Sequence, residues 1–402
     1  MTGDTLSQKL QRIRDLQFFG EEGGVVPVID VAATSTFMNP EDMPRAFKGE
    51  MQGCYLYSRH SNPTVQMFSK KIAAMEGYPA ALGVASGMAA ISASLENVLV
   101  HGDHMIAHSV VYGGTYALLK NIMPKRGIDV SFSNFDSLKD LEALFTPKTK
   151  VLYLETMSNP MLNIANFGAI KEFKARHPEV TVIVDNTFAP LLATPKDWGA
   201  DVVVHSCTKF ISGSSDLIAG AVCASQDFID ALIDINSGPI MLGGAVMDPR
   251  IAHELYMRLD HLYLRMRGHS ERALEAAQIA DRLGIAVAYP GMENHKHHER
   301  ANKYFDTSYG YGAMLTLDLE TPERAFKIAS QLQKDNFALY AVSLGFSRTL
   351  VTCPALSTSS EIPEDEQAAM DLSPGLLRFS MGFTGDPDSM LQRFERALKT
   401  AL

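Results

Sequence analysis

Short apolar runs alternate with helix-length amphipathic segments between about residue 80 and residue 225, and this alternation constrains the fold most strongly. Runs such as VLYLET (151–156) are rich in apolar and β-branched residues, which is typical of strands in a parallel sheet covered on both faces. Segments such as FGAIKEFKARH have the apolar spacing of helices. We therefore predict an α/β fold with a mostly parallel central sheet, helices on both faces and right-handed crossovers. The expected strands lie within residues 80–87, 104–109, 151–156, 180–187, 201–206 and 219–225.

The pattern changes near residue 248, where apolar residues follow a helical spacing over more than thirty positions. This stretch predicts one long or broken helix. After it, GAMLTLDLE (312–320) alternates like a strand beside solvent, and LLRFSMGF (376–383) is typical of another strand. PERAFKIASQLQKD predicts a helix, and DPDSMLQRFERALKTAL predicts a capped terminal helix. In a chain of 402 residues, these elements indicate a separate, smaller α/β C-terminal domain.

Charge and cysteine content argue against several kinds of partner. The formal charge is −10 and no long basic run occurs, whereas binding to a nucleic-acid backbone needs clustered Lys and Arg. The first twenty residues are charged throughout, unlike a signal peptide, and the apolar stretch 77–95 is interrupted by proline and glycine, unlike a membrane span. We expect a cytoplasmic protein without nucleic-acid or membrane partners. Its cysteines are expected to be reduced, because they lie far apart and form no CxxC: Cys54, Cys207, Cys223 and Cys353.

Several of the predicted strands end in reactive side chains. In open parallel sheets, ligands bind at the carboxyl ends of the strands. One acid or lysine in such a place is more often a helix cap or a solvated side chain, but several different groups converge here on one edge. The residues at or just beyond these strand ends are Ser86, Gly87, Asn159, Asp185, Ser206, Thr208 and Lys209.

These residue types can bind a phosphorylated pyridine aldehyde. Gly87 can begin a helix whose free N–H groups face an anion, and Ser206 and Thr208 can donate to phosphate oxygens. Lys209 can bond covalently to a carbonyl carbon once its amine is desolvated. Asp185 can keep a ring nitrogen protonated through a charge-assisted hydrogen bond. Together these groups predict a pocket for pyridoxal 5′-phosphate (PLP).

Motifs for other chemistry are weaker. No GxGxxG follows a predicted strand and no GxxxxGK occurs, which disfavours a nucleotide phosphate loop and a nicotinamide oxidoreductase. A GxSxG nucleophile motif is also absent. The stretch NHKHHER (294–300) is rich in histidine, but it lacks the HExxH spacing and holds no thiolate. We expect a solvated loop there and no metal site.

The lysine segment SCTKFISGSSDLIAGAV (206–222) resembles that of the Cys/Met-metabolism enzymes that use PLP. This family includes methionine γ-lyase, cystathionine γ-lyase, cystathionine γ-synthase and O-acetylhomoserine sulfhydrylase. The likeness spans about residues 25–400 and implies a fold-type I PLP-dependent transferase. It implies an N-terminal arm (1–60) that contributes to the neighbouring subunit's site, a PLP-binding domain (61–247) and a C-terminal domain (248–402). The other matching motifs occur in the family's order: YSRHSNPT, ASGMAAI, VVYGGTY, ETMSNP, VDNTFAP, AVSLGFSRTL and GLLRFSMGF.

The resemblance implies a role for each matching residue. Lys209 would hold the cofactor covalently and later shuttle protons, Asp185 would pair with the pyridine nitrogen, and Tyr112 would stack on the ring and assist the leaving group. Arg378, with Ser343 nearby, would bind the carboxylate of an amino-acid substrate. The family's remaining cofactor contacts fall on Gly87, Met88, Ser206 and Thr208 at the phosphate, on Asn159 at the ring hydroxyl, on Thr187, and on Tyr57 and Arg59, which would reach the phosphate of the neighbouring subunit. The protein is therefore expected to be a homodimer at least, and a homotetramer by the family's pattern.

The substrate is less constrained than the cofactor. Val342 is apolar where cystathionine lyases are expected to carry an acid, which favours methionine γ-lyases and sulfhydrylases. Gly114 stands where methionine γ-lyases typically carry cysteine. We predict a carbon–sulfur lyase of the methionine γ-lyase type; the alternatives are a γ-substitution enzyme (O-acetylhomoserine sulfhydrylase or cystathionine γ-synthase) and a non-catalytic regulator that has kept the fold. Further departures from the family's subgroups lie in FGEEGGV (19–25), PIMLGGAV (239–246) and CPALSTSSE (353–361).

Overall fold

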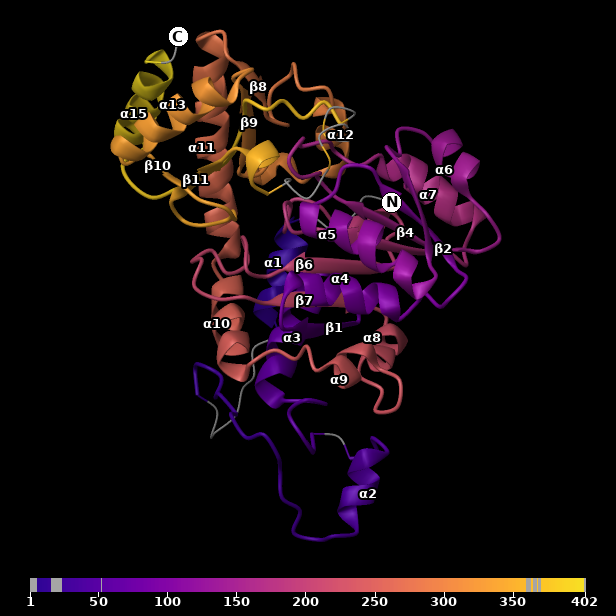
Figure 1. The fold of residues 1–402 in the computed structure, drawn as a ribbon. Coiled ribbons are helices and arrows are strands. Elements are labelled where there is room, and N and C mark those ends of the chain that lie inside the picture. The colour runs from indigo at the N-terminus through magenta and orange to yellow at the C-terminus, as the bar shows by residue number, and fades with distance from the viewer. Residues whose placement is uncertain are drawn as a thin grey trace.

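The computed structural model describes residues 6–15, 24–51, 53–358, 363, 367 and 370–400. A larger α/β unit carries a smaller α/β unit on one side, and residues 24–60 extend from the other side (Figure 1). Two of the segments singled out in the sequence are incomplete, because residues 19–23 and 359–361 lie outside the described residues. The predicted α/β class with a mostly parallel central sheet is confirmed.

The larger unit is built around a seven-stranded sheet in the order β1-β7-β6-β5-β4-β2-β3. The run β3, β2, β4, β5, β6 is parallel, whereas β7 is antiparallel to both β6 and β1. β3 escaped prediction because its sequence, DVSFS, is polar in part and lies at the sheet edge with no fully buried residue. The strands are β1 (Ala80–Val84), β2 (His104–His108), β3 (Asp129–Ser133), β4 (Thr149–Glu155), β5 (Thr181–Asp185), β6 (Val202–Ser206) and β7 (Gly220–Ala224).

Helices cover both faces of this sheet, and the strands divide their side chains between two cores. In β5, Val182 and Val184 join one hydrophobic cluster and Ile183 joins the other, as the two-residue period of a strand requires. One face is covered by α3 (Pro63–Glu76), α6 (Leu138–Leu144), α7 (Phe167–Arg176) and α10 (Pro249–Leu259). The other is covered by α4 (Gly87–Glu96), α5 (Gly113–Ala117), α8 (Gln226–Leu232) and α9 (Pro239–Gly243).

The smaller unit contains a five-stranded sheet in the order β10-β11-β12-β9-β8. The long helical stretch of the sequence is broken at Asp260 and His261, which separate α10 from α11. The terminal helix is capped as predicted, because Asp386 accepts a hydrogen bond from the Ser389 N–H. The strands are β8 (Ala286–Ala288), β9 (Met314–Asp318), β10 (Ala338–Tyr340), β11 (Thr349–Thr352) and β12 (Leu376–Ser380), and the helices are α11 (Leu262–Arg282), α12 (His298–Tyr304), α13 (Pro322–Lys334) and α15 (Pro387–Lys399).

β9 does not border solvent, contrary to the prediction from its alternating sequence. The strand lies between β12 and β8, and four of its five residues are buried. Leu315 and Leu317 pack into the core of the smaller unit, whereas Met314 belongs to the core of the larger unit. The sheet is therefore covered on its second face by the larger unit, which brings β12 close to the carboxyl edge of the large sheet.

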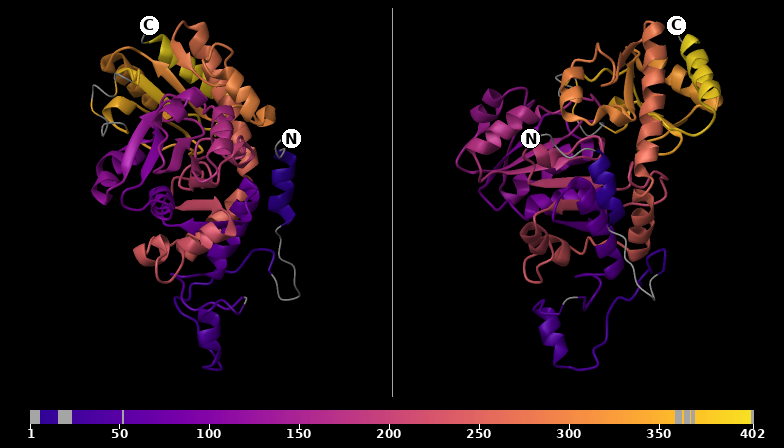
Figure 2. Two further views of the ribbon diagram at one scale, coloured as in Figure 1. Left: turned by 90° about the vertical axis from the view of Figure 1, so that its right-hand side faces the viewer. Right: turned by 180° about the vertical axis from the view of Figure 1, so that it is seen from behind.

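The N-terminal region has one packed helix and one extended segment. Helix α1 (Leu6–Asp15) lies beside α3 (Figure 2). Residues 24–51 and 53–60 run away from the body and contain α2 (Asp42–Phe47), which buries none of its residues (Figure 1). Val25, Val28, Met38 and Phe47 are exposed along this arm. Within the described residues, no helix combines the length and apolar character needed to cross a membrane.

Candidate active site

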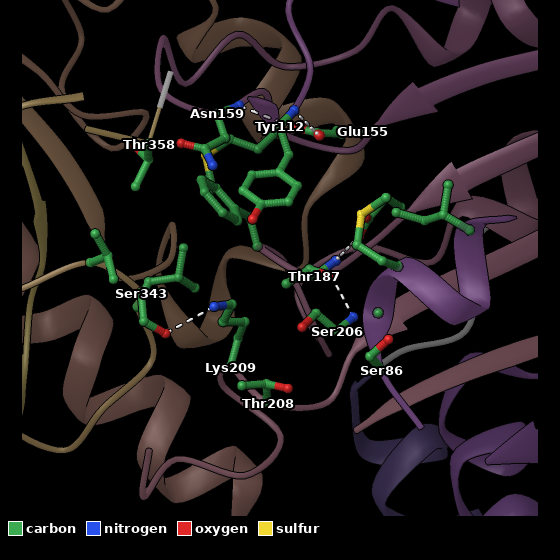
Figure 3. Close-up of a pocket in the computed structure, with 18 of the residues that line it drawn as sticks. Ser86, Tyr112, Glu155, Asn159, Thr187, Ser206, Thr208, Lys209, Ser343 and Thr358 are labelled. Atoms are coloured by element: carbon green, nitrogen blue, oxygen red, sulfur yellow. Dashed lines mark hydrogen bonds between the residues drawn. The ribbon is translucent and has the colours of Figure 1, made fainter. Parts of the chain in front are cut away.

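A cavity of about 300 Å³ lies at the carboxyl ends of β4, β5 and β6, where they face the smaller unit (Figure 3). Parallel strands place their ends along one edge, so residues far apart in sequence meet there. The lining residues that the sequence had singled out are Ser86, Gly87, Met88, Tyr112, Asn159, Asp185, Thr187, Ser206, Thr208, Lys209, Val342, Ser343 and Arg378.

One end of the cavity is formed by the start of α4 and the end of β6. Ser86 caps α4 by accepting a hydrogen bond from the Ala89 N–H at 3.1 Å. Gly87 lies so close to β6 that a Cβ there would be 2.6 Å from the Cβ of Ser206. Thr208 exchanges hydrogen bonds with the backbone of Ala219 through its hydroxyl. This end therefore offers free helical N–H groups and small hydroxyl side chains, which suit a phosphate group.

Lys209 reaches the middle of the cavity from the turn after β6. Its Nζ donates to the Ser343 hydroxyl at 2.9 Å. Burial, and then the nearby Arg378 guanidinium, lowers the pKa of Lys209 to about 8. A larger fraction of the amine is therefore neutral near pH 7 than in an ordinary lysine, and the neutral amine is the form that attacks a carbonyl carbon.

Asp185 ends β5 and is held by the turn that follows it. Its Oδ1 accepts a hydrogen bond from the Thr187 N–H at 2.9 Å, and the Thr187 hydroxyl accepts from the Ser206 N–H at 2.8 Å. Burial raises the pKa of Asp185. A cationic N–H placed against this carboxyl would keep it ionised, as the expected pairing with a pyridinium nitrogen requires.

Tyr112 and Asn159 approach the cavity from two loops that meet at Glu155, the last residue of β4. The Tyr112 N–H donates to one Glu155 oxygen at 2.6 Å, and the Asn159 N–H donates to the other at 3.1 Å. The Tyr112 ring extends into the cavity (Figure 3) and is 42% exposed, which leaves a face open to a planar ligand. Burial, followed by the neighbouring Asp185 carboxyl, raises the pKa of Glu155.

Arg378 comes from β12 of the smaller unit and is 2% exposed. Its guanidinium donates to Asn159 Oδ1 at 2.7 Å and to the Ser343 carbonyl at 3.2 Å. Burial lowers the pKa of Arg378 to about 10, so the side chain remains charged at neutral pH. Its Nε has no hydrogen-bond partner among the described residues. A buried cation with a spare donor beside Lys209 is suited to a carboxylate.

Two of the predicted cofactor residues lie elsewhere. Tyr57 and Arg59 belong to the extended arm and do not line this cavity within their own chain. Arg59 donates to the Met241 carbonyl at 2.7 Å, and its guanidinium lies 5.6 Å from the centre of the Tyr57 ring. Their predicted contact with a phosphate in a neighbouring subunit stays a prediction.

Other lining residues were not assigned to the site from sequence. Glu155 carries the same signal as Asp185, an acid at the end of an apolar strand, and could have been found by it. The apolar lining residues lie in loops or at helix positions where nothing in the sequence distinguishes them. These unassigned residues are Ile91, Glu155, Met157, Phe188, Ile218, Leu344 and Thr358.

The histidine-rich stretch is only partly the solvated loop that we predicted, because Asn294, Lys296 and Glu299 are exposed but the histidines are not. His295 is buried, and burial lowers its pKa to about 4. His297 accepts a hydrogen bond from the Ile164 N–H at 2.9 Å, and burial lowers its pKa to about 3. These side chains pack because the stretch leads into α12, next to the loop that follows β4. Among the described residues, no group of three or more His, Cys, Asp or Glu side chains is close enough to hold a metal ion.

Comparison with known proteins shows which family the chain belongs to. Residues 15–399 match the family described as Cys/Met metabolism PLP-dependent enzyme. The chain belongs to this family. It is 43% identical over 385 residues to a methionine gamma-lyase of Arabidopsis thaliana, which covers 94% of this chain and 87% of that protein.

Solved structures of similar enzymes share the fold of this chain. A cystathionine gamma synthase from Xanthomonas oryzae pv. oryzae superposes with a TM-score of 0.88 and 28% identity, over 100% of this chain and 99% of that one. A structure from Campylobacter jejuni has a TM-score of 0.88 and 26% identity, over 98% of this chain and 99% of that one. The Campylobacter structure contains N′-pyridoxyl-lysine-5′-monophosphate.

The residues of this chain fit PLP, the cofactor of the family. The glycine at the start of α4 leaves the helical N–H groups accessible beside Ser206, as a phosphate needs. Lys209 supplies an amine with a lowered pKa in the same cavity, and Asp185 supplies a buried carboxyl for a ring nitrogen. The chain is a PLP-dependent enzyme of sulfur amino-acid metabolism.

Proposed function

We propose that the protein is a carbon–sulfur lyase that converts methionine and water into 2-oxobutyrate, ammonia and methanethiol. The observation that carries this proposal is the apolar part of the cavity lining. Besides Met88, the apolar side chains that line the cavity are Ile91, Met157, Phe188, Ile218, Val342 and Leu344. An unbranched thioether can pack against such a surface, whereas the distal ammonium of cystathionine would require an acid there. The resemblance to the Arabidopsis methionine gamma-lyase supports the same choice.

The two carboxyl groups in the cavity already have other partners. Asp185 is expected to pair with the pyridine nitrogen of PLP, and each oxygen of Glu155 accepts from a backbone N–H group. Neither is therefore free to bind a distal ammonium group. Among the described lining residues, these are the only acids. The cavity thus favours an uncharged end of the substrate.

Each catalytic residue would have its own role in the reaction. Bound PLP withdraws electrons from the α-carbon of the amino acid, which makes the α-proton acidic. Lys209 Nζ removes that proton and returns protons to the carbon chain, as its lowered pKa allows near neutral pH. Arg378 binds the α-carboxylate and fixes the α-carbon beside Lys209. The Tyr112 hydroxyl supplies a proton to the departing sulfur.

A substrate panel tests the proposed activity. We expect methionine alone to yield 2-oxobutyrate and methanethiol in equal amounts, measured by keto-acid and thiol assays on the PLP-loaded protein. If product forms only when an acylated homoserine and a thiol are both supplied, the protein is a γ-substitution enzyme. A protein that binds PLP and turns over neither mixture would be a regulator that has kept the fold.

We also propose that the site is shared between two subunits of a homodimer at least, with a homotetramer as the full assembly. The exposed arm that carries Tyr57 and Arg59 supports this, because its apolar side chains are uncovered in a single chain. On this proposal, residues 1–60 form the arm, residues 61–247 the PLP domain and residues 248–402 the C-terminal domain. The proposed location is the cytoplasm, where the cysteines would remain reduced.

A mixing experiment tests the shared site. Arg59→Ala and Lys209→Ala should each be inactive alone, since each removes one required residue from every site. In a mixed dimer, one of the two sites contains both native residues. After dissociation and reassociation in equal amounts, roughly a quarter of the native activity should return. No recovery, although native mass measurements show mixed dimers, would contradict the shared site.

A further inference from the structure

Glu155 is a buried carboxyl in the cavity that the proposed reaction does not use. It is the last residue of β4 and is 7% exposed. In the parallel pairing of β4 with β5, its Cα is the partner of the Cα of Asp185. Burying two carboxyl groups on adjacent strands is costly, so Glu155 needs a compensating contact. That contact consists of two backbone N–H groups from different loops.

These two N–H groups belong to the residues that enter the cavity from either side. One oxygen of Glu155 accepts from Tyr112, 43 positions away in sequence, at 2.6 Å. The other oxygen accepts from Asn159, 4 positions away, at 3.1 Å. Figure 3 shows both loops meeting at this carboxyl. Because a single planar group accepts both hydrogen bonds, the two loops are fixed relative to each other.

The connection continues from Asn159 to the substrate end of the cavity. Asn159 Oδ1 accepts from Arg378 at 2.7 Å, and Arg378 in turn donates to the carbonyl of Ser343 at 3.2 Å. A displacement of the Asn159 backbone would therefore move the partner that orients the buried guanidinium. Among the described residues, no hydrogen bond or ion pair joins Glu155 to Arg378, so we expect an effect of Glu155 on the guanidinium to be transmitted through Asn159.

We propose that Glu155 is a positioning residue whose carboxyl bridges the backbones of Tyr112 and Asn159. It thereby fixes the position of the cofactor ring relative to the arginine that binds the substrate carboxylate. This inference rests on the proposed PLP site, but it does not depend on which sulfur amino acid is the substrate. Glu155→Gln keeps the size of the side chain. It leaves one amide oxygen as acceptor and turns an NH₂ group toward the other backbone N–H, so one of the two bonds is lost.

The test compares Glu155→Gln with Glu142→Gln, a carboxyl of α6 that contacts His177 far from the cavity. For Glu155→Gln we expect the Kd of the apoprotein for PLP to rise about tenfold or more, and the KM for the amino acid to rise by a similar factor. The visible circular dichroism of bound PLP should also change, since the Tyr112 ring shifts. The Glu142 variant should match the native protein in all three measurements.

A double-mutant cycle separates positioning from mere stabilisation. If Glu155 acts through Asn159 on Arg378, adding Glu155→Gln to Arg378→Lys should raise KM by much less than it does in the native background. If Glu155→Gln does not fold, Glu155→Asp takes its place, because the shorter acid keeps the charge but cannot reach both N–H groups. A folded variant with lowered thermal stability but with PLP affinity, dichroism and KM within twofold of native overturns the proposal. If the native protein does not bind PLP, the proposed PLP site is wrong, and the role of Glu155 falls with it. If only the Glu155 measurements fail, the PLP site stands.

Discussion

The two halves of the cavity are assembled in different ways. The cofactor half, with Asp185, Ser206 and Lys209, comes from strand ends of one sheet and from the helix that begins at Gly87. The substrate half has Arg378 from β12 and Ser343 from the loop between β10 and β11, and it enters only because the smaller unit packs over the larger one. The first half therefore depends on local sequence and strand order, and the second depends on the docking of two units.

This difference separates two ways of losing activity. A change in the cofactor half should reduce PLP binding or proton transfer, whereas a change in the substrate half should raise KM and leave PLP in place. Lys209 lies at the boundary, because its amine contacts Ser343 and its pKa responds to Arg378. Variants of Lys209, Arg378 and Gly114 measure how independent the two halves are.

Lys209→Ala should have the largest effect, because it removes the group that binds PLP covalently and moves protons. We expect turnover to fall by on the order of 10³-fold or more, measured by keto-acid release. Lys209→Arg is the matched control for charge and should be equally inactive, since its guanidinium does not deprotonate. Activity within tenfold of native in either variant would remove Lys209 from the mechanism.

Arg378→Gln should act mainly on the substrate half, and on the cofactor half only through the pKa of Lys209. Loss of charge-assisted hydrogen bonds worth about 1.5–3 kcal/mol should raise KM by roughly 10- to 100-fold. At a pH above the Lys209 midpoint, the Kd for PLP should stay within twofold of native, because Arg378 is not expected to touch the cofactor. Kinetics and cofactor titration on the same preparation check both statements. A parallel loss of PLP affinity would show that the halves are not separable.

The pH dependence of PLP capture tests the coupling between the halves. Only the neutral amine of Lys209 is nucleophilic, and burial lowers its pKa to about 8. The rate at which apoprotein captures PLP should therefore rise with pH and level off above about 8. In Arg378→Gln the midpoint should move upward, because a neighbouring cation that disfavours the protonated amine has been removed. A midpoint near the ordinary lysine value of 10.5 would contradict the effect of burial.

Gly114→Ala should have the smallest effect. A Cβ at this position would lie 2.7 Å from Cε1 of Tyr112, so the ring must rotate away. An off-rotamer shift of this kind should reduce kcat/KM by about 2- to 10-fold. Gly243→Ala is the matched control, because a Cβ there meets nothing within 4 Å. Equal kinetics in both variants would mean that the orientation of Tyr112 does not limit the reaction.

The cofactor half could be predicted from residue types because β4, β5 and β6 are apolar runs with polar residues at their ends. Arg378 could not be found in this way, since it lies inside β12 and reaches the cavity through tertiary packing. Only the family resemblance singled it out. Glu155 could have been found as an acid at the end of an apolar strand. Its contacts with backbone N–H groups of two loops could not be predicted from the sequence.

In the fold too, local features could be predicted from the sequence and features that depend on tertiary packing could not. The strands of the parallel sheet were predicted within a few residues, except the polar edge strand β3. β9 was assigned a solvent face because alternation alone does not tell water from a second packed unit. His295 was placed in solvent for a similar reason, since its burial depends on the packing of the α12 region. Contacts between units are therefore the part that sequence patterns describe least well.

The hydrogen bond from Lys209 to Ser343 joins the two units inside the cavity. If PLP were bonded covalently to Lys209 Nζ, this hydrogen bond would be lost and the Ser343 hydroxyl would need another partner. The loop between β10 and β11 should then be held less firmly, so its amide hydrogens should exchange faster with solvent in loaded protein than in apoprotein. Cofactor loading would in this way loosen the part of the smaller unit that meets the incoming amino acid.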